Sequence, residues 1–229
     1  ITQDYNTSIT APANPTKEGY TFDGWDTAIP TTMPAGDLTI TATWKINQYK
    51  VTVDTAGGSF ATVPGGWTKE SDDYTKNFDY NTSYATIISD IGSPTKTGYT
   101  FAGYTPSEGN LGITGVTLTA QWTINPYTIT FDTQGGSAVD DVVKDYNTTV
   151  TLPDLNSTAK EGYTFKGWSL TINGTLVTTH LLVDDITLYA VWEINQYTIT
   201  FNSDGGSAVA SITQDYNTSI TAPANPTKE

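Results

Sequence analysis

The chain contains no cysteine, one histidine and one methionine among its 229 residues. The absence of cysteine excludes disulfide bonds, thiolate metal sites and thiol catalysis. The single histidine, His180, is the only imidazole available for acid–base chemistry. The longest apolar runs are short and strand-like, so the sequence predicts no membrane insertion in this segment.

Positive charge is scarce as well. Ten Lys and Arg residues stand against 24 Asp and Glu residues, which gives a formal net charge of −14. Nucleic acids, heparin-like polymers and anionic membranes require clustered positive charge, so none of them is an expected partner. The abundance of Thr, Tyr and Gly is typical of secreted β-rich proteins. We therefore expect an extracellular, cell-surface or secreted location.

The most informative feature is an exact repeat. The segment ITQDYNTSITAPANPTKE begins at Ile1 and again at Ile212, which sets a repeat length of 211 residues. Structural convergence preserves patterns of residue type but does not reproduce identical residues, so we expect the chain to be a window from a longer tandem array. A catalyst needs one copy of its site, whereas copying gives reach, valency or stiffness. The repeat favours a structural or adhesive protein.

A shorter repeat lies inside the longer one. An opening strand with a Gly-Gly turn starts at Tyr49 (YKVTVDTAGGS), Tyr127 (YTITFDTQGGS) and Tyr197 (YTITFNSDGGS). An Asp-Tyr turn, a GYTF box and a closing strand that ends in Trp follow. The predicted domains are an N-terminally truncated unit at 1–48, complete units at 49–126 and 127–196, and a truncated unit at 197–229. The second unit carries an insertion at 64–77.

Alternating side chains identify the strands. Tyr127, Ile129 and Phe131 share one face of the opening strand at 127–131, as a half-buried strand requires. Each unit is predicted to contain four or five short strands and one crossover that is irregular or briefly helical. Of the proline-containing crossovers, only PDLNSTAKEG, which begins at Pro153, could close a helical turn or two. The predicted structural core comprises Trp25, Trp44, Trp122, Trp168, Trp192, Tyr127, Ile129 and Phe131.

The joints between units are short. Four residues separate each closing Trp from the next opening Tyr, and none of the joints is rich in Gly or Ser, which excludes a floppy linker. Each joint contains an isoleucine (Ile46, Ile124 or Ile194), which we expect to pack at the interface between units. Such joints favour a semi-rigid rod.

These motifs resemble the Listeria–Bacteroides repeat family, the B repeats of internalin-type bacterial surface proteins. YTITFDTQGGS, the GYTFKGW box and the LYAVW ending carry the resemblance, in that order, across essentially the whole chain. The resemblance implies a mostly β, β-grasp-like α+β domain used in tandem as a spacer, stalk or adhesive module, without catalysis. Some relatives bind sulfated polysaccharide through basic surfaces, a property that the negative charge here does not support. Tyr104 replaces the Trp of the other units with a side chain of similar volume.

Few residues are candidates for chemistry. His180 has no counterpart in the other units and is expected on a loop or surface. The acidic pairs Asp72-Asp73, Asp140-Asp141 and Asp184-Asp185 do not follow a spaced calcium-loop pattern, so solvated turns are favoured over a metal site. Trp67, in the insertion, is a candidate glycan or protein contact, although packing onto its own domain is favoured. No cofactor or metal is expected.

The sequence thus predicts a non-catalytic structural or adhesive tandem-repeat segment of a large extracellular protein or fibre, acting as stalk or spacer. The alternative is a glycan- or protein-binding adhesin module that uses the inserted loops. The expected partners are further copies of the repeat, in cis or in a fibre, and a glycan or surface protein. The split end units also predict that the polypeptide continues beyond both ends, or that neighbouring chains complete them by strand addition, with continuation favoured.

Overall fold

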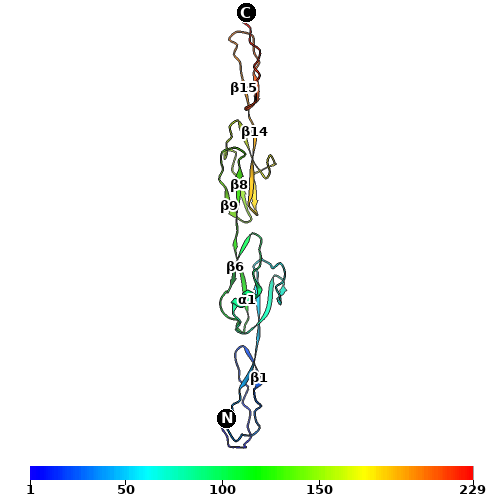
Figure 1. Ribbon diagram of the computed structural model, residues 1–229, viewed down its shortest axis with the longest axis vertical. Coiled ribbons are helices and arrows are strands. Elements are labelled where there is room, and N and C mark those ends of the chain that lie inside the picture. The colour runs from blue at the N-terminus through cyan, green and yellow to red at the C-terminus, as the bar shows by residue number, and fades with distance from the viewer. Residues whose placement is uncertain (229) are drawn as a thin grey trace. The chain divides into compact units, whose positions relative to one another are not determined.

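A computed structural model describes residues 1–228 of the chain. The residues group into two compact units, Ile1–Thr123 and a second that begins at Ile124. Each unit contains one five-stranded sheet together with two-stranded pairings (Figure 1). The protein is mostly β, which agrees with the period-two alternation of the sequence.

The large sheet of the first unit has the strand order β4-β5-β3-β7-β6. Its strands are β3 (Gln48–Asp54), β4 (Thr68–Glu70), β5 (Asp73–Asp79), β6 (Tyr99–Thr105) and β7 (Val116–Ile124). The central strand β3 is antiparallel to β5 and parallel to β7. The predicted insertion at 64–77 forms β4 and the first part of β5, so it extends a hairpin of the sheet.

The described part of the chain has its helix, α1 (Tyr84–Ile91), in the second repeat. Ser83 caps its first turn by accepting a hydrogen bond from the Thr86 amide at 3.2 Å. Gly92 ends the helix with φ of +76°, a left-handed conformation that suits glycine. Ile87 and Ile91, one turn apart, are buried against the sheet core.

The prediction of a helical turn in the third repeat, in the segment from Pro153, is wrong. Asp154 Oδ1 accepts a hydrogen bond from the Asn156 amide at 2.9 Å, and the Asp154 carbonyl accepts one from Ser157. These local bonds satisfy the backbone in turns and compete with a helix. The helix forms in the second repeat because YATIISDI spaces its isoleucines for one apolar face.

The large sheet of the second unit has the order β12-β11-β14-β8-β9. Its strands are β8 (Pro126–Asp132), β9 (Val142–Asp145), β11 (Tyr163–Ser169), β12 (Leu176–Val177) and β14 (Ile186–Ile194). β8 and β14 are parallel, with Ile129 opposite Ile186 and Phe131 opposite Leu188. Beside this sheet, β10 (Thr148–Thr151) pairs with β13 (Thr179–Leu182).

Each large sheet has its own hydrophobic core. The core of the second repeat gathers Val51, Val53, Ile87, Leu118 and their neighbours. Ile129, Phe131 and Trp168 are buried in the core of the third repeat, and Tyr127 and Trp192 pack against it partly buried. Trp122 has the corresponding partly buried place in the second repeat.

The two end segments contain only short hairpins. β1 (Tyr20–Trp25) pairs with β2 (Ala42–Ile46), and β15 (Gln196–Ile199) pairs with β16 (Ile212–Asp215). Within residues 1–48 and 197–228, no hydrophobic side chain belongs to the buried core. Trp25 and Trp44 are accordingly only half-buried.

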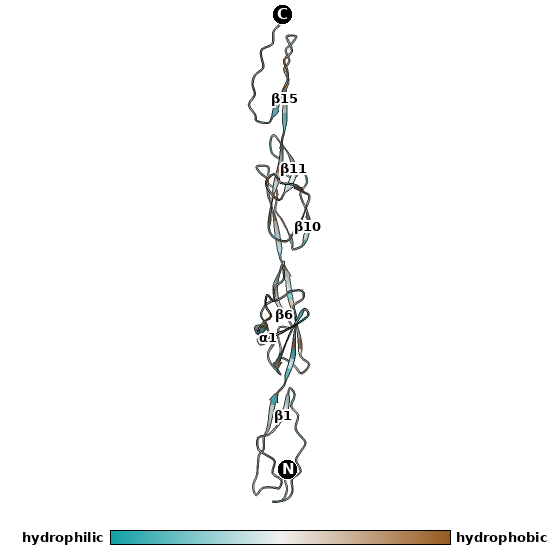
Figure 2. Cartoon of the chain, turned by 90° about the vertical axis from the view of Figure 1, so that its right-hand side faces the viewer, coloured by the Kyte–Doolittle hydropathy of each residue, from teal (hydrophilic) through white to brown (hydrophobic). Residues whose placement is uncertain are grey.

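Hydrophobic and hydrophilic stretches are interspersed along the chain (Figure 2). Among residues 1–228, no helix is both long and apolar enough to cross a membrane.

Candidate functional site

The joint between the first and second repeats is a single residue. β2 ends at Ile46 and β3 begins at Gln48, so only Asn47 lies between them. The Asn47 amide donates to the Gly19 carbonyl at 2.9 Å, and its own carbonyl accepts from the Tyr80 amide at 2.8 Å. Its side-chain Oδ1 accepts from the Thr21 hydroxyl at 2.6 Å. One asparagine therefore binds both repeats.

An aromatic ring closes this joint. Tyr80, from the Asp-Tyr turn of the second repeat, lies directly on Gly19 of the first, and a Cβ at Gly19 would overlap the ring. The φ of Gly19 is +76°, which also favours glycine. The rings of Tyr20 and Tyr49 meet Tyr80 edge-on, with centroids 6.1 and 6.2 Å away.

The same joint recurs between the third repeat and the C-terminal segment. Asn195 stands between β14 and β15, donates to the Gly162 carbonyl and accepts from the Tyr216 amide, both at 2.8 Å. The Thr164 hydroxyl donates to Asn195 Oδ1 at 2.6 Å. Tyr216 covers Gly162 as Tyr80 covers Gly19, and again leaves no room for a Cβ. Near the start of the compact unit that begins at Ile124, part of the pattern recurs at Asn125, whose carbonyl accepts a hydrogen bond from the Tyr146 amide at 2.9 Å.

Glutamates border both tyrosines. The Tyr80 hydroxyl donates to Glu18 Oε1 at 3.1 Å, and this hydrogen bond is the main reason that the pKa of Tyr80 is raised. The pKa of Tyr216 is raised as well, first by desolvation and then by the charge of Glu161.

The sequence-based description of the joints is corrected in one point. The strands continue past the closing Trp, so one residue separates the strands instead of four. Of the three isoleucines expected at the joints, Ile46 and Ile124 are half-buried and Ile194 is 36% exposed. At Asn47 and Asn195, the contact is made by the Asn that follows the isoleucine, the Tyr of the Asp-Tyr turn and the Gly of GYTF. The signal was present in the internal repeats, as the recurrence of INQY or INPY.

A second recurrent contact ties the Gly-Gly turn to the lysine before GYTF. Lys96 Nζ donates to the Ala56 carbonyl at 2.9 Å and lies 4.5 Å from the Tyr99 ring centroid. Trp122 Nε1 donates to the Thr55 carbonyl at 2.9 Å. In the third repeat, the same contacts join Lys160 to Gln134 and Tyr163, and Trp192 to Thr133. These bonds explain why the closing Trp is fixed although partly exposed.

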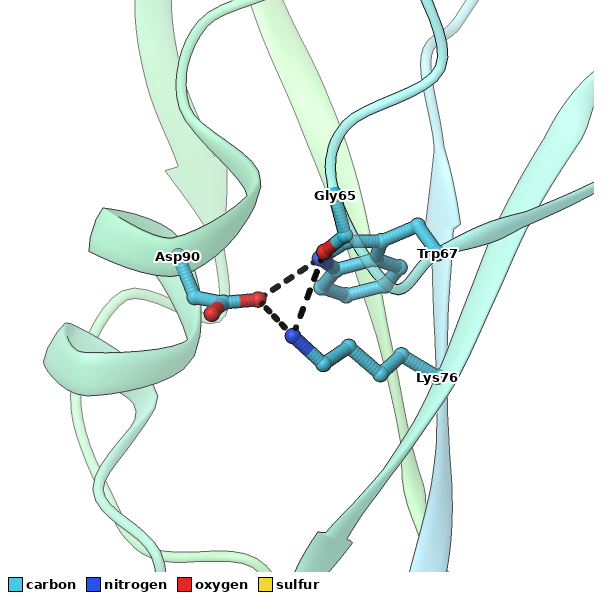
Figure 3. A network of polar contacts seen from close by, with 4 residues as sticks. All are labelled: Gly65, Trp67, Lys76 and Asp90. Atoms are coloured by element: carbon cyan, nitrogen blue, oxygen red, sulfur yellow. Dashed lines mark hydrogen bonds and ion pairs between the residues drawn. The ribbon is translucent and has the colours of Figure 1, made fainter.

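The insertion of the second repeat is anchored by a polar cluster around Asp90 of α1 (Figure 3). Asp90 Oδ2 accepts from Trp67 Nε1 at 2.7 Å and from Lys76 Nζ at 2.6 Å. Lys76 Nζ also lies 3.5 Å from the Gly65 carbonyl and 5.1 Å from the Phe78 ring centroid. The hydrogen bond from Lys76, with a smaller one from Trp67, holds the pKa of Asp90 below its ordinary value against the opposing effect of burial.

The cluster changes the interpretation of Trp67. A ligand contact requires an exposed ring, but Trp67 is only 6% exposed and belongs to the core of the second repeat. Phe78 packs against it with centroids 5.7 Å apart. The structure therefore places Trp67 in the interior, as the packing alternative predicts, because its indole N–H finds a carboxylate there.

The remaining candidates, His180 and the acidic pairs, do not form a common site. His180 was expected on a loop or surface, but it belongs to β13 opposite Val150 and is half-buried. Of the acidic pairs, Asp185 accepts a hydrogen bond from the Thr128 amide at 2.8 Å. Within residues 1–228, no three His, Cys, Asp or Glu side chains are grouped so that they could hold a metal ion.

Comparison with known families agrees with the motifs. Residues 2–43, 127–191 and 197–229 match the Listeria-Bacteroides repeat domain. The chain belongs to the Listeria–Bacteroides repeat family. The matched stretches omit residues 44–126, the repeat that carries the insertion, so the family match is narrower than the motif resemblance.

Relatives place these repeats within larger proteins. A protein of Evansella cellulosilytica named as a Gly-rich membrane protein is 30% identical over the whole chain, which covers 27% of that relative. A second protein of that organism, named as a membrane protein, is 33% identical over 84% of the chain and 28% of the relative. Internalin H of Listeria monocytogenes is 31% identical over 55% of the chain, which matches 23% of its length. The chain thus spans about a quarter of the relatives that it matches.

Proposed function

We propose that this segment is a non-catalytic stalk or spacer in a large extracellular surface protein, in which the repeats set reach and stiffness. The observation that carries the proposal is the recurrence of one joint, with Asn47 and Asn195 in equivalent roles. Each such joint combines three hydrogen bonds with a tyrosine seated on a glycine. Contacts that serve no chemistry and recur at two repeat boundaries suit a mechanical role.

The strand order supports assigning each complete repeat to a β-grasp-like fold. In the second repeat a hairpin, β3-β5, leads through α1 to β6 and β7, and the first and last of these strands lie parallel at the centre. The third repeat keeps the parallel centre, β8 beside β14, and replaces the helix with turns. The proposed array is therefore a succession of small mixed sheets.

The names of the relatives support a surface location. Two are named as membrane proteins and one as an internalin. We extend to this chain only the proposal that it is part of an extracellular, cell-surface or secreted protein. The net charge of −14 suits a solvated, self-repelling spacer.

The adhesin alternative is less well supported. Its main sequence argument was an exposed Trp67, and that ring is buried. What the insertion presents to solvent is chiefly polar, including the exposed pair Lys69 and Glu70 of β4. Specific binding of a glycan or a protein by the isolated second repeat would favour the adhesin module over the spacer.

Small-angle scattering tests the spacer proposal. We expect the chain, at concentrations where it is monomeric, to be elongated with a narrow range of interdomain angles. Replacing both Tyr80 and Tyr216 by Ala should widen that range, because each joint loses its ring. Tyr5→Ala is the matched control, since Tyr5 occupies the same turn position but is 72% exposed. A broad distribution for the unmodified chain, or an equal effect of the control, would contradict the proposal.

A further inference from the structure

The first and last strands of each complete repeat lie side by side and run parallel. In the second repeat, residues 51–54 of β3 are opposite residues 116–119 of β7. In the third repeat, residues 129–132 of β8 are opposite residues 186–189 of β14. Each of these four strands has a further neighbour on its other side, so none of them is an edge strand. The opening and closing strands therefore form the centre of each large sheet.

The backbone enters and leaves the second repeat through these two strands. Asn47 alone connects β2 to β3, and Asn125 alone connects β7 to β8. Because β3 and β7 are parallel, the start of β3 and the end of β7 lie at opposite ends of the sheet. Tension along the chain therefore pulls the two strands in opposite directions along their own axes, and the hydrogen bonds between them are loaded in shear.

A ladder that is loaded in shear resists more than one that is opened from an end. The hydrogen bonds of a parallel ladder are evenly spaced, so shear loads them together, whereas peeling breaks them one at a time. Sliding also changes the register, and a shift of one residue turns each inward side chain to the other face. Val51, Val53 and Leu118 are fully buried at this ladder, as are Ile129 and Leu188 in the third repeat. Sliding therefore costs apolar burial as well as hydrogen bonds.

A tryptophan fastens the closing strand just beyond the ladder. Trp122 Nε1 donates to the Thr55 carbonyl at 2.9 Å, and the ring lies on Gly58, where a Cβ would overlap it. The turn is braced from within, because the Thr55 hydroxyl donates to the Gly58 carbonyl at 2.7 Å. Displacement of β7 toward its C-terminal end would pull Trp122 off this turn.

The third repeat has the same fastening. Trp192 Nε1 donates to the Thr133 carbonyl at 2.9 Å, and its ring lies on Gly136. The Thr133 hydroxyl donates to the Gly136 carbonyl at 2.9 Å. The crossover segments of the two repeats differ, since one contains α1 and the other contains turns. The parts that the two repeats share are those that tension along the chain would load.

We propose that the parallel ladder and the closing tryptophan of each complete repeat form a mechanical clamp, which keeps the repeat folded when the chain is under tension. The clamp comprises residues 51–54, 116–119 and Trp122 in the second repeat, and residues 129–132, 186–189 and Trp192 in the third. Forced unfolding is governed by the rate at which the native state opens, so the clamp acts through that rate and depends on the direction of pulling. The inference rests on the proposed stalk function, because a segment that bears tension is one that uses such a clamp.

Pulling one repeat in two directions tests the clamp. The chain has no cysteine, so the full chain can be held in an optical trap at two introduced cysteines. Gln48→Cys with Thr123→Cys loads the ladder of the second repeat in shear. Gln48→Cys with Thr114→Cys pulls on the same end of both strands, since Gly115 lies against the Lys50 backbone. All three replaced side chains are exposed.

We expect the shear pair of cysteines to unfold the repeat at the higher force. At one common force, unfolding should be on the order of tenfold slower in shear than in peeling, because several hydrogen bonds must break together. Denaturant unfolding without load should give the same free energy for both pairs, which share the Gln48→Cys change. Equal unfolding forces in the two directions would overturn the proposal.

Trp122→Phe tests the tryptophan. The variant keeps a ring on Gly58 but removes the hydrogen bond to Thr55, so unfolding in shear at a fixed force should become faster by on the order of tenfold. The peeling pair should respond less, because its ladder opens from the other end. Trp67→Phe is the matched control, since it also removes an indole donor from this repeat, bonded to Asp90, but lies outside the clamp. Equal acceleration by the two variants in shear would contradict the role of Trp122.

These measurements are independent of the scattering experiment. A second repeat that unfolds at the same force in both directions would lack the clamp, and the chain could still be an elongated spacer. A broad range of interdomain angles would contradict the proposed spacer, whereas direction-dependent unfolding would remain a property of each repeat.

Discussion

At the scale of residues, polar atoms decide how the aromatic side chains are held. Trp168 Nε1 donates to the Pro153 carbonyl at 3.2 Å, and the Tyr104 hydroxyl donates to the Gly92 carbonyl at 2.9 Å. Both rings are nearly fully buried and both bind a backbone carbonyl of their crossover segment. Tyr therefore replaces Trp in the second repeat because it fills a similar volume and delivers an equivalent donor. Burial also raises the pKa of the Tyr104 hydroxyl.

In the cluster around Asp90, a polar atom likewise holds an aromatic ring in place. Lys76 is only 24% exposed, and its attraction to Asp90 offsets part of the cost of desolvation. Trp67 is held at its ring by Phe78 and at its N–H by the carboxylate. The insertion is thus fixed to α1 by one carboxylate oxygen that accepts two hydrogen bonds.

This contact predicts a pH-dependent stability. The folded-state pKa of Asp90 is depressed, so its contribution is present near neutral pH and is lost as pH falls below about 4. Asp90→Asn should lower the free energy of unfolding at pH 7 by on the order of 1 kcal/mol. The difference from the unmodified chain should shrink in acid. Denaturant unfolding across pH measures it, with the exposed Asp72→Asn as control. A difference that is constant with pH would contradict the role of Asp90.

At the scale of elements, the joint results from strands that almost continue into one another. β14 and β15 are separated by Asn195 alone, which leaves little freedom for the backbone. The glycine of GYTF allows the tyrosine of the following repeat to contact backbone directly. The proposed stiffness of a joint therefore depends on the absence of one side chain.

Gly162→Ala tests this contact. The added Cβ would overlap the Tyr216 ring, so the ring must leave and the joint should loosen at a cost of about 1–3 kcal/mol. Gly135→Ala is the matched control, because its φ of +86° carries similar backbone strain but its Cβ meets only Lys160, at 3.7 Å. Quenching of tyrosine fluorescence or ring NMR shifts would report on Tyr216. Equal responses of the two variants would show that strain, and not the ring contact, matters.

At the scale of the whole molecule, the complete repeats and the end segments differ in their degree of packing. The second and third repeats each have a buried core, and the end segments have none within the described residues. A closed core requires the opening and closing strands of one repeat side by side. A repeat therefore has a buried core when its opening strand and its closing strand lie side by side.

Hydrogen exchange should reveal this difference. At concentrations where the chain is monomeric, the amides of β2 and β15 should exchange on the order of 100-fold faster than those of β8 and β14. The reason is that the end hairpins lack a core and can open locally. Equal protection of both sets would mean that the end segments fold cooperatively without their missing strands.

The sequence by itself determined the repeat, the strand pattern and the family. These features depend on local periodicity and on internal copies, which a single chain displays directly. Period-two alternation located the opening and closing strands, and the eighteen-residue identity located the split unit. Ile129, Phe131 and Trp168 could be assigned to the core because each continues an inward-facing series.

Only the tertiary structure decided how repeats join and what the insertion does. Asn47, Gly19 and Tyr80 are far apart in sequence, and their contact depends on two strand ends meeting. The burial of Trp67 depends on Asp90 presented by a helix that local propensity did not single out. Local patterns fix which face of a strand is apolar, but partners in space fix which polar group satisfies another.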